Sequence, residues 1–512
     1  MTKTTITRRR FIQWAGLGSL GLAAGGTALR RLTPAQAAGS AAHDVEINLT
    51  AAPAQQAILP GNNTTVWKYT ATLVKGDAAN LVTLPNTYLG PIIHLRTGQR
   101  VRINFNNNIG EESIVHWHGL HVPHEADGHP SYVINSGQSY VYEFDVLDRA
   151  GTYWYHPHPH GLTGKQAYMG LAGLFYISDG EEDLAGLPTG NYDLPLVIQD
   201  RTFDTDNQLV YSADSAGFLG DQILVNGQPN TTPLSVEALP YRLRLLNGSN
   251  SRIYKLAWAD GAPLSVIATD GGLLEKAVSR NYLMLAPGER AELLVDFSQW
   301  GVGSTTTLKS LAYSGAAGSN TALPPGSEFT VADFQISAAT STPTTPTIYK
   351  TYLPVVTGDG TRPPLPSGVT RSFQLYMQQG TWTIDGRTFE TTGVVDEEIV
   401  TLGDREIWEF DNNSPFGGGG NSGQPHPMHI HGLQFRIVSR TPPPNGSTQY
   451  NNWLTVKDGY VDDGWQDTIL LMPGEKVQVD VTFKDYTGLF LYHCHNLEHE
   501  DMGMMRNYRV DL

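Results

Sequence analysis

Histidines are the residues whose spacing in this sequence points most directly to chemistry. The chain has 16 histidines, and none of them lies between residues 161 and 425. Residues i and i+2 of a β-strand point to the same face, so a His-x-His pair offers two imidazoles to one side. One such pair also occurs by chance in protein cores, and in zinc hydrolases and cupins, but eight buried imidazoles without partners would be costly. We therefore predict that metal is bound by four pairs, which are His116 with His118, His156 with His158, His429 with His431, and His493 with His495.

The single cysteine of the chain, Cys494, lies between the two histidines of the last pair. A disulfide within the chain and a multi-cysteine zinc site are therefore excluded. In a strand, the sulfur would point to the face opposite the neighbouring imidazoles. With His426, His499 and Met504 it would give two imidazoles, a thiolate and a weak thioether, which is the ligand set of a blue-copper electron-transfer site. The alternatives are a buried inert thiol at Cys494 and simple core packing of Met504.

The elements that must position these side chains are predicted to be β-strands, because their segments alternate and repeat. Alternating strands that end in an Asn or Gly turn occur at 101–108, 242–249 and 406–413. A Gly turn followed by an alternating strand recurs at 137–145, 287–297 and 473–483. A third repeated segment occurs only in the first and last copies, at 151–158 and 488–495. Strands at this spacing predict an all-β chain built from β-sandwiches.

The repeats also predict the domain organisation. We expect domain 1 at 40–180, domain 2 at 190–338 and domain 3 at 371–512. Residues 339–370 are rich in Thr, Pro and Gly, which is typical of a linker. Domain 2 carries the repeat but no histidine pair, so we expect it to hold no metal.

The first 37 residues have the composition of an export signal. Adjacent arginines at Arg8 to Arg10 precede a weakly apolar stretch from Trp14 to Leu29, and Ala35 to Ala37 offers small residues for signal peptidase. We predict that residues 1–37 are a twin-arginine signal peptide, rather than an ordinary helix with arginines by chance. That route exports folded proteins, so the mature chain is expected in the periplasm or outside the cell, without membrane insertion.

The formal net charge of −16 is unfavourable for contact with phosphate backbones and anionic lipids. Nucleic acids and membrane surfaces are therefore not expected as partners. We expect a monomer that meets only a small reducing substrate and dioxygen.

Together, the histidine and cysteine motifs resemble the four copper-binding motifs of the multicopper oxidases. The chain is most similar to the three-domain bacterial laccases, cuprous oxidases and bilirubin oxidases, and the resemblance covers essentially all of the mature chain. It implies three cupredoxin-like Greek-key β-sandwich domains and four copper ions, one of type 1, one of type 2 and two of type 3. The motifs are His116-Trp117-His118-Gly119, Tyr155-His156-Pro157-His158, His426-Pro427-Met428-His429-Ile430-His431, and His493-Cys494-His495 followed by His499 and Met504.

The resemblance implies a ligand role for each motif residue. The type 1 (blue) copper would be held by His426, Cys494, His499 and Met504. The type 2 copper would be held by His116 and His429. The type 3 pair would be held by His118, His156, His158, His431, His493 and His495. The resulting trinuclear cluster would lie between domains 1 and 3. Six histidines receive no ligand role and are expected in solvent or around the cluster, namely His43, His94, His121, His124, His129 and His160.

The resemblance further implies a laccase-like oxidase that takes single electrons from phenolic or aromatic amine donors and reduces dioxygen to water. The donor would meet the edge of His499. Asp127 and Glu500 match acids that relatives use to supply protons, although either could be an ordinary surface acid. A Met ligand such as Met504 usually accompanies a lower copper potential, which favours easily oxidised donors.

Other functions remain open on the same scaffold. Oxidation of cuprous or ferrous ions, or of bilirubin, would need the same copper sites. A dedicated cuprous oxidase role is disfavoured, because the chain has only nine methionines and residues 339–370 contain none. Further alternatives are a copper-free scaffold related to cell-division proteins, a passive copper store or electron carrier, and a copper nitrite reductase.

Overall fold

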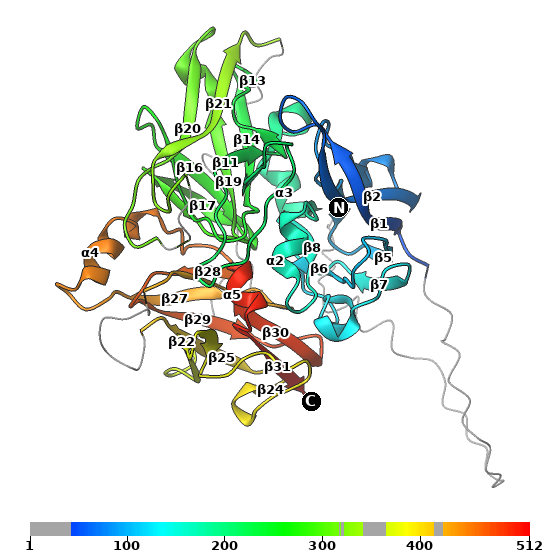
Figure 1. Ribbon diagram of the computed structural model, residues 1–512, viewed down its shortest axis with the longest axis vertical. Helices are drawn as coiled ribbons and strands as arrows, with labels where there is room; N and C mark the ends of the chain where they lie inside the picture. Colours follow the sequence, from blue (N-terminus) through cyan, green and yellow to red (C-terminus); the bar gives the residue numbers. More distant parts are fainter. Residues whose placement is uncertain (1–41, 317, 319–321, 341–364, 414–422) are drawn as a thin grey trace, which may run out of the picture. The chain divides into compact units, whose positions relative to one another are not determined.

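The computed structural model describes residues 42–316, 318, 322–340, 365–413 and 423–512 (Figure 1). The predicted signal peptide at 1–37 and most of the predicted linker at 339–370 lie outside the described residues. Contacts divide the chain into Met1–Ala42 and His43–Leu512, and the second unit contains every strand described below. Within the described part of the chain, no helix is long and apolar enough to cross a membrane.

The first pair of sheets is formed by residues 45–178. Its two sheets enclose one apolar core, to which Ile47 and Phe105 contribute from one sheet and Trp117 and Phe175 from the other. In sheet order, the strands are β2 (Thr64–Lys75), β1 (Val45–Gln56), β5 (Arg100–Asn107) and β7 (Ser139–Asp145), facing β3 (Leu81–Val82), β4 (Ile92–Arg96), β9 (Gly173–Ser178), β8 (Gly151–Pro157) and β6 (Val115–His118).

The second pair of sheets is formed by residues 193–337 around its own apolar core. One sheet consists of β12 (Gln228–Pro229), β11 (Gln222–Val225), β10 (Asp193–Arg201), β14 (Pro240–Asn247), β19 (Arg290–Asp296), β16 (Leu264–Thr269) and β17 (Gly272–Arg280). The other consists of β13 (Leu234–Glu237), β21 (Phe329–Ser337), β20 (Thr305–Ser310), β15 (Tyr254–Trp258) and β18 (Leu283–Leu285).

The third pair of sheets is formed by residues 371–511, and Cys494 and Met504 belong to its core. One sheet consists of β23 (Thr381–Ile384), β22 (Arg371–Gln378), β25 (Arg405–Asp411), β29 (Lys476–Thr482) and β27 (Arg436–Thr441). The other consists of β24 (Ile399–Thr401), β31 (Met505–Asp511), β30 (Gly488–Cys494), β26 (His426–Ile430) and β28 (Thr468–Leu471). The short α-helices are α2 (Thr163–Tyr168), α3 (Gly180–Ala185), α4 (Thr448–Leu454) and α5 (Leu497–Asp501).

The repeated sequence segments form equivalent strands in the three sheet pairs. The first repeated segment forms β5, β14 and β25, and the second forms β7, β19 and β29. The two strands pair antiparallel in each case, β5 with β7, β14 with β19 and β25 with β29. The third repeated segment forms β8 and β30. The predicted all-β, β-sandwich class is therefore confirmed.

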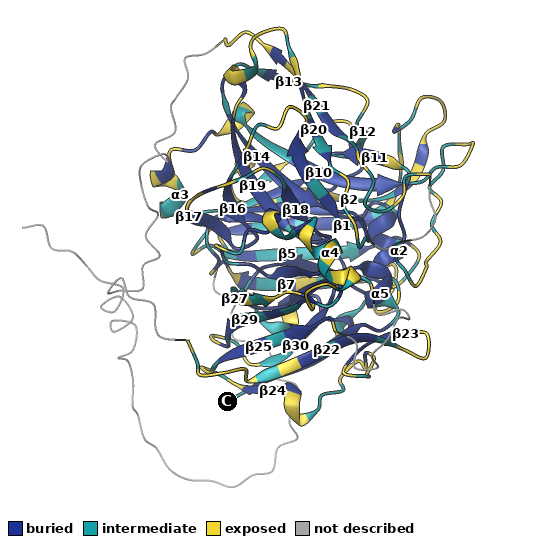
Figure 2. Ribbon diagram, turned by 90° about the vertical axis from the view of Figure 1, so that its left-hand side faces the viewer, coloured by how far each residue is buried: buried dark blue, intermediate teal, exposed yellow. Residues whose placement is uncertain are grey.

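Apolar contacts between segments fix the three sheet pairs against one another. Trp154 of the first pair packs in one cluster with Val197 and Leu246 of the second, and Met284 of the second packs with Leu470 of the third. The first and third pairs also meet where the backbone N–H groups of Thr163 and Gly164 in α2 donate to the Asp501 carboxylate in α5. Figure 2 shows that most strands are buried or intermediate, whereas exposed residues lie mainly in loops and in short helices such as α3 and α4.

Candidate metal centres

Strand β30 presents side chains to two different sites. It runs antiparallel to β26, with Cys494 opposite Met428 and His493 opposite His429. Because side chains alternate along a strand, Cys494 points into the core of the third sheet pair while its neighbours point the other way. The register of this sheet therefore places the Cys494 sulfur and the flanking imidazoles on opposite faces, as the sequence pattern predicts.

Three donor atoms converge on the Cys494 side of β30. The Cys494 sulfur lies 3.4 Å from His426 Nδ1 and 3.6 Å from His499 Nδ1, and these two nitrogens are 3.2 Å apart. All three side chains are buried. His499 is positioned by the start of α5, where its backbone N–H donates to the Asn496 side chain. This group can hold one soft metal ion through two nitrogens and a thiolate.

Met504 is held next to the same group by its backbone. The N–H of Cys494 donates to Met504 O over 3.0 Å, and the N–H of Met504 donates to His499 O over 2.9 Å. The Met504 side chain is fully buried in the same apolar core as Cys494. The predicted thioether therefore lies in the neighbourhood of the three donors.

The edge of His499 is predicted to meet the donor, and in the structure the exposed fraction of this residue is 0 %. Its Nε2 lies 3.0 Å from Gln424 Oε1, and its ring packs against the Trp382 ring with 4.5 Å between centroids. Trp382 and Gln424 cover this histidine, and neither residue belongs to a motif that the sequence could single out.

The eight histidines of the four pairs converge on the other side of β30, between the first and third sheet pairs. β6 carries the first pair, and β8, β26 and β30 each carry the first histidine of a pair and end one residue before the second. All eight side chains are at most 1 % exposed. His116 Nε2 lies 3.3 Å from His429 Nε2. His493 Nε2 lies 3.0 Å from His431 Nε2 and 3.3 Å from His158 Nε2.

The hydrogen bonds of these rings test whether they fit a metal. His116 Nδ1 faces the carbonyl oxygen of Asp127 at 2.6 Å, and His429 Nδ1 faces that of Asp467 at 2.7 Å. A carbonyl oxygen accepts only, so each Nδ1 carries the proton and each Nε2 carries a lone pair. Two lone pairs that face each other at this distance repel unless a cation lies between them.

The same reasoning applies to the second group of rings. His431 Nδ1 donates to the Asp127 carboxylate over 2.7 Å, and His493 Nδ1 donates to Cys494 O over 3.0 Å. Their Nε2 atoms are therefore unprotonated and face each other. A neutral imidazole whose other nitrogen donates to an oxygen is the usual form of a metal-binding histidine. These residues consequently fit a metal cluster.

A third group consists of His118, His156 and His495. The His495 ring centroid lies 4.9 Å from that of His118 and 5.3 Å from that of His156. Among the described residues, His118 Nδ1, His156 Nε2 and both ring nitrogens of His495 have no hydrogen-bond partner. Buried polar atoms are rarely left unpaired in native proteins, so these nitrogens fit a role as metal ligands.

Burial sets the charge state of the rings. It lowers the pKa of His118, His431 and His493 well below the usual value and lowers that of His156 to about 3. The imidazoles are therefore neutral, which is the form that binds metal. Burial also raises the pKa of the Cys494 thiol, and a bound metal ion would favour the thiolate.

The two predicted acids lie directly against the histidine cluster and not at the surface. Asp127 is fully buried and accepts from His431 as described above. Glu500 is 1 % exposed, and its carboxylate lies 3.5 Å from His158 Nε2 and 3.3 Å from His493 Nδ1. Burial raises the pKa of both carboxyl groups well above the usual value.

A third carboxylate at the cluster, Asp467, is not among the residues that the sequence motifs predict. Its Oδ1 accepts from His118 Nε2 over 2.9 Å, and it lies at the end of a loop that precedes β28. Burial alone would raise the pKa of Asp467, but Arg290 more than reverses this shift and keeps the group ionised. No spacing pattern links Asp467 to the histidines, so only the fold could reveal it.

Comparison with known proteins places this arrangement in a family. Models of multicopper oxidase domains match residues 65–182 and 362–512. A multicopper oxidase of Staphylococcus haemolyticus is 34 % identical over 441 residues, which are 85 % of each chain. A laccase of Bacillus subtilis is 30 % identical over 472 residues, covering 83 % of this chain and 84 % of the laccase.

The fold agrees with a solved structure from the same family. The McoA multicopper oxidase of Aquifex aeolicus is 36 % identical, and the superposition covers 92 % of this chain and 97 % of that chain with a TM-score of 0.76. The predicted cupredoxin-like β-sandwich class is thereby confirmed, as is copper as the cofactor. The chain belongs to the multicopper oxidase family and is a laccase-like oxidoreductase that passes electrons from small-molecule donors to dioxygen.

Proposed function

We propose that this chain couples the one-electron oxidation of phenolic or aromatic amine donors to the four-electron reduction of dioxygen to water. One observation carries the proposal. On one face of β30, the Cys494 sulfur lies beside two imidazole nitrogens. On the other face, His493, the residue before it, belongs to the histidine cluster. Electrons received on one face would thus need to cross only the backbone of a single strand.

The ligand roles follow the four groups of donor atoms. His426, Cys494, His499 and Met504 would hold the type 1 copper. His116 and His429, whose Nε2 atoms face each other, would hold the type 2 copper. The type 3 pair would be held by His118, His156 and His495 on one side and His158, His431 and His493 on the other. Bound copper supplies one-electron transfer at the first site and the site of dioxygen reduction at the others.

The residues around the first site determine how a donor approaches. The His499 ring lies beneath Trp382, which is itself only 1 % exposed, and Gln424, which is half-buried, so the donor would approach on the Gln424 side. Trp382 is fixed in turn, because its indole N–H donates to Ser215 O over 2.6 Å.

Two carboxyl groups would handle the protons that dioxygen reduction consumes. Glu500 lies beside His158 and His493, and its carboxyl group can pass a proton into the cluster. Asp127 holds His431 through Oδ2, and its other oxygen lies 3.5 Å from His116 Nδ1. Asp127 would thus serve both as an anchor for these rings and as a proton donor.

The cellular context and the domain division are proposed on sequence grounds. The twin-arginine motif supports export of the folded protein to the periplasm or the medium, where it would act as a monomer outside the membrane. The proposed domains are 40–180, 190–338 and 371–512, each of which contains one pair of sheets. Only the first and third would supply metal ligands.

Steady-state oxygen consumption with a panel of donors tests the proposed function. The panel consists of a dimethoxyphenol, an aromatic amine, bilirubin, Cu(I), Fe(II) and Mn(II), with metal-free protein as the control. We expect the highest kcat/KM with the phenol or the amine. Oxygen uptake with Cu(I) or Fe(II) but with neither aromatic donor would instead establish a metal-ion oxidase. Equal rates with metal-free protein would refute the copper-dependent mechanism.

A further inference from the structure

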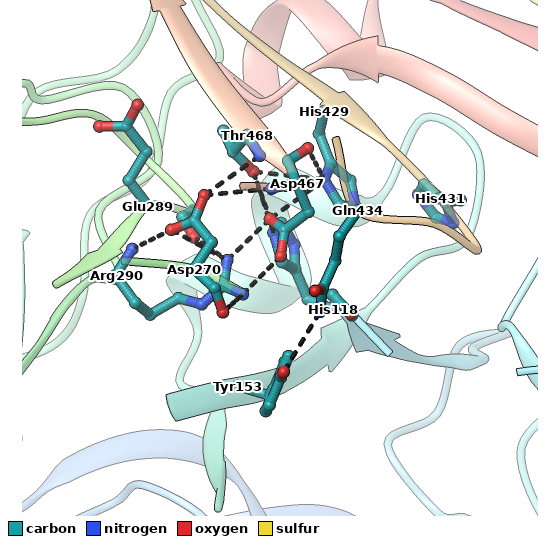
Figure 3. A network of polar contacts seen from close by, with 12 residues as sticks. His118, Tyr153, Asp270, Glu289, Arg290, His429, His431, Gln434, Asp467 and Thr468 are labelled. Carbon is teal, nitrogen blue, oxygen red and sulfur yellow. Dashed lines mark hydrogen bonds and ion pairs between the residues drawn. The ribbon is translucent and has the colours of Figure 1, made fainter. Parts of the chain in front are cut away.

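The middle pair of sheets contributes no histidine to the cluster, yet one of its side chains binds Asp467, which contacts two of the histidines. Arg290, the first residue of β19, is fully buried and faces Asp467 (Figure 3). Its Nη1 donates to Asp467 Oδ1 over 2.8 Å, and its Nη2 donates to Asp467 Oδ2 over 2.5 Å. Both oxygens of the carboxylate are therefore held by one planar guanidinium group.

The remaining N–H groups of Arg290 are also paired. Nε donates to Thr152 O over 3.0 Å, Nη1 donates to Gly288 O over 3.0 Å, and Nη2 donates to Asp270 O over 3.2 Å. Thr152 belongs to the first sheet pair, Asp270 to the second and Asp467 to the third. Arg290 thus lies at the junction of all three and can adopt only one orientation there.

Asp467 transmits this orientation to two rings. Its carboxylate accepts from His118 Nε2, which leaves His118 Nδ1 as the atom free for a metal. Its backbone carbonyl accepts from His429 Nδ1, which leaves His429 Nε2 free. The tautomers of these two rings, one from each outer sheet pair, are therefore both set by Asp467.

Two further features hold Asp467 close to the middle sheet pair. Gly119 follows His118 with φ of +90°, and a Cβ at this position would overlap both Asp467 Oδ2 and Arg290 Nη2. Asp270 accepts from the backbone N–H groups of Asp467 and Thr468, over 3.3 and 3.2 Å. The middle sheet pair consequently holds Asp467 at its side chain and at its backbone.

We propose that Arg290 is a positioning residue for the trinuclear cluster, by which the copper-free middle domain fixes His118 and His429 through Asp467. The inference rests on the proposed ligand roles of these two histidines. It assigns the middle domain a part in metal binding itself, beyond that of a spacer between the outer domains. Arg290 touches neither substrate nor a predicted metal ion, so its effect would be carried entirely by the geometry of Asp467.

Arg290→Lys is the most informative variant, because lysine keeps the charge but cannot hold both carboxylate oxygens in one plane. The matched control is Arg242→Lys. Arg242 is also fully buried in the middle sheet pair and pairs with Glu292 over 2.6 Å and with Glu182, but those carboxylates contact no histidine of the cluster. Both variants lose a buried ion-pair geometry, and only the first disturbs Asp467.

The readouts are metal analysis, the type 2 signal in electron paramagnetic resonance, and titration with a copper chelator, with the blue absorbance as an internal measure of folding. We expect Arg290→Lys to keep the blue absorbance, to change the type 2 signal and to lose cluster copper at chelator concentrations about 10- to 100-fold lower than wild type. Arg242→Lys should match wild type in all of these measurements.

The outcomes separate the inference from the proposed function. A wild-type protein without a type 2 signal would refute the ligand assignment and this inference together. A normal wild type with an Arg290→Lys variant indistinguishable from Arg242→Lys would overturn the inference alone. If Arg290→Lys does not fold, Asp270→Asn decides the matter, because Asp270 holds the backbone of Asp467 and touches no histidine. A changed type 2 signal in Asp270→Asn supports the inference, and an unchanged signal overturns it.

Discussion

Cys494 and His493 are adjacent in one strand, and their side chains enter two separate clusters. The Cys494 sulfur lies 3.4 Å from His426 Nδ1, whereas His493 Nε2 lies 3.0 Å from His431 Nε2 on the opposite face of the sheet. The alternation of a β-strand alone produces this arrangement. It gives an oxidase two sites that differ in ligand chemistry and are joined by a single peptide linkage.

Removal of copper should destabilise the protein, because the lone pairs of facing imidazoles would then repel. A ligand at about 1,000 times its dissociation constant stabilises the folded state by about 4 kcal/mol per site. We therefore expect chelated, metal-free protein to melt at a lower temperature than the holoprotein, by calorimetry. Copper added back should restore the original Tm. An identical Tm for the two forms would contradict the fit of these rings to metal.

Gly119→Ala should disrupt the cluster while leaving the blue site intact. The new Cβ would overlap Asp467 and Arg290, and the positive φ of Gly119 disfavours any side chain. Gly98→Ala is the matched control, because Gly98 has φ of +93° and open space around its Cβ position. Both variants should lose about 1 kcal/mol or more from backbone strain. Only Gly119→Ala should lose the type 2 signal, and loss in both would point to strain alone.

Glu500→Gln should slow the step that uses dioxygen and spare the step that uses the donor. Glutamine keeps the shape of the side chain but cannot release a proton, and general acid catalysis typically contributes about 100-fold or more. Anaerobic stopped-flow should show normal bleaching of the blue absorbance by a phenol. Its return on mixing with dioxygen should be about 100-fold slower. Unchanged reoxidation would remove Glu500 from the proton path.

His129 should make the fold sensitive to acid. Burial, together with repulsion from His124, lowers its pKa to about 4, although a hydrogen bond from Nε2 to the Asn507 side chain opposes the shift. The unfolded chain takes up this proton near pH 6.5, whereas the folded chain takes it up only near pH 4. The stability that neutral His129 contributes is therefore fully present above pH 6.5 and is lost as the pH falls toward 4.

The loss at this position amounts to about 3 kcal/mol. His129→Gln should therefore flatten the dependence of unfolding free energy on pH between 6.5 and 4, measured by urea denaturation. At neutral pH the variant should lose only the free energy of the contacts that His129 makes with Asn507 and Ser131. A pH dependence as steep as that of wild type would show that another group causes the acid sensitivity.

The motif residues can be predicted from the sequence because their spacing along a strand determines the face to which each side chain points. Strand alternation puts His493 and His495 on one face and Cys494 on the other, and the structure brings each pair to the common cluster. Asp467 and Arg290 could not be predicted in the same way. They lie 177 residues apart and meet only because β19 and the loop before β28 are brought together by the packing of the second and third sheet pairs.

The environment of His499 illustrates a second limit. Its motif predicts a buried nitrogen donor but not what covers the ring. Trp382 comes from β23, far away in sequence, and Gln424 lies just before β26 without any distinctive pattern. Contacts of this kind depend on loop geometry, which local sequence does not determine.

Replacement of Cys494 by serine is the most direct test of the account. Serine has nearly the same shape but cannot supply the thiolate that joins the two sites. The account predicts that Cys494→Ser loses the blue absorbance and oxygen uptake with phenols, while the type 2 signal of the histidine cluster persists. A Cys494→Ser protein that stays blue and consumes oxygen at the wild-type rate would contradict it.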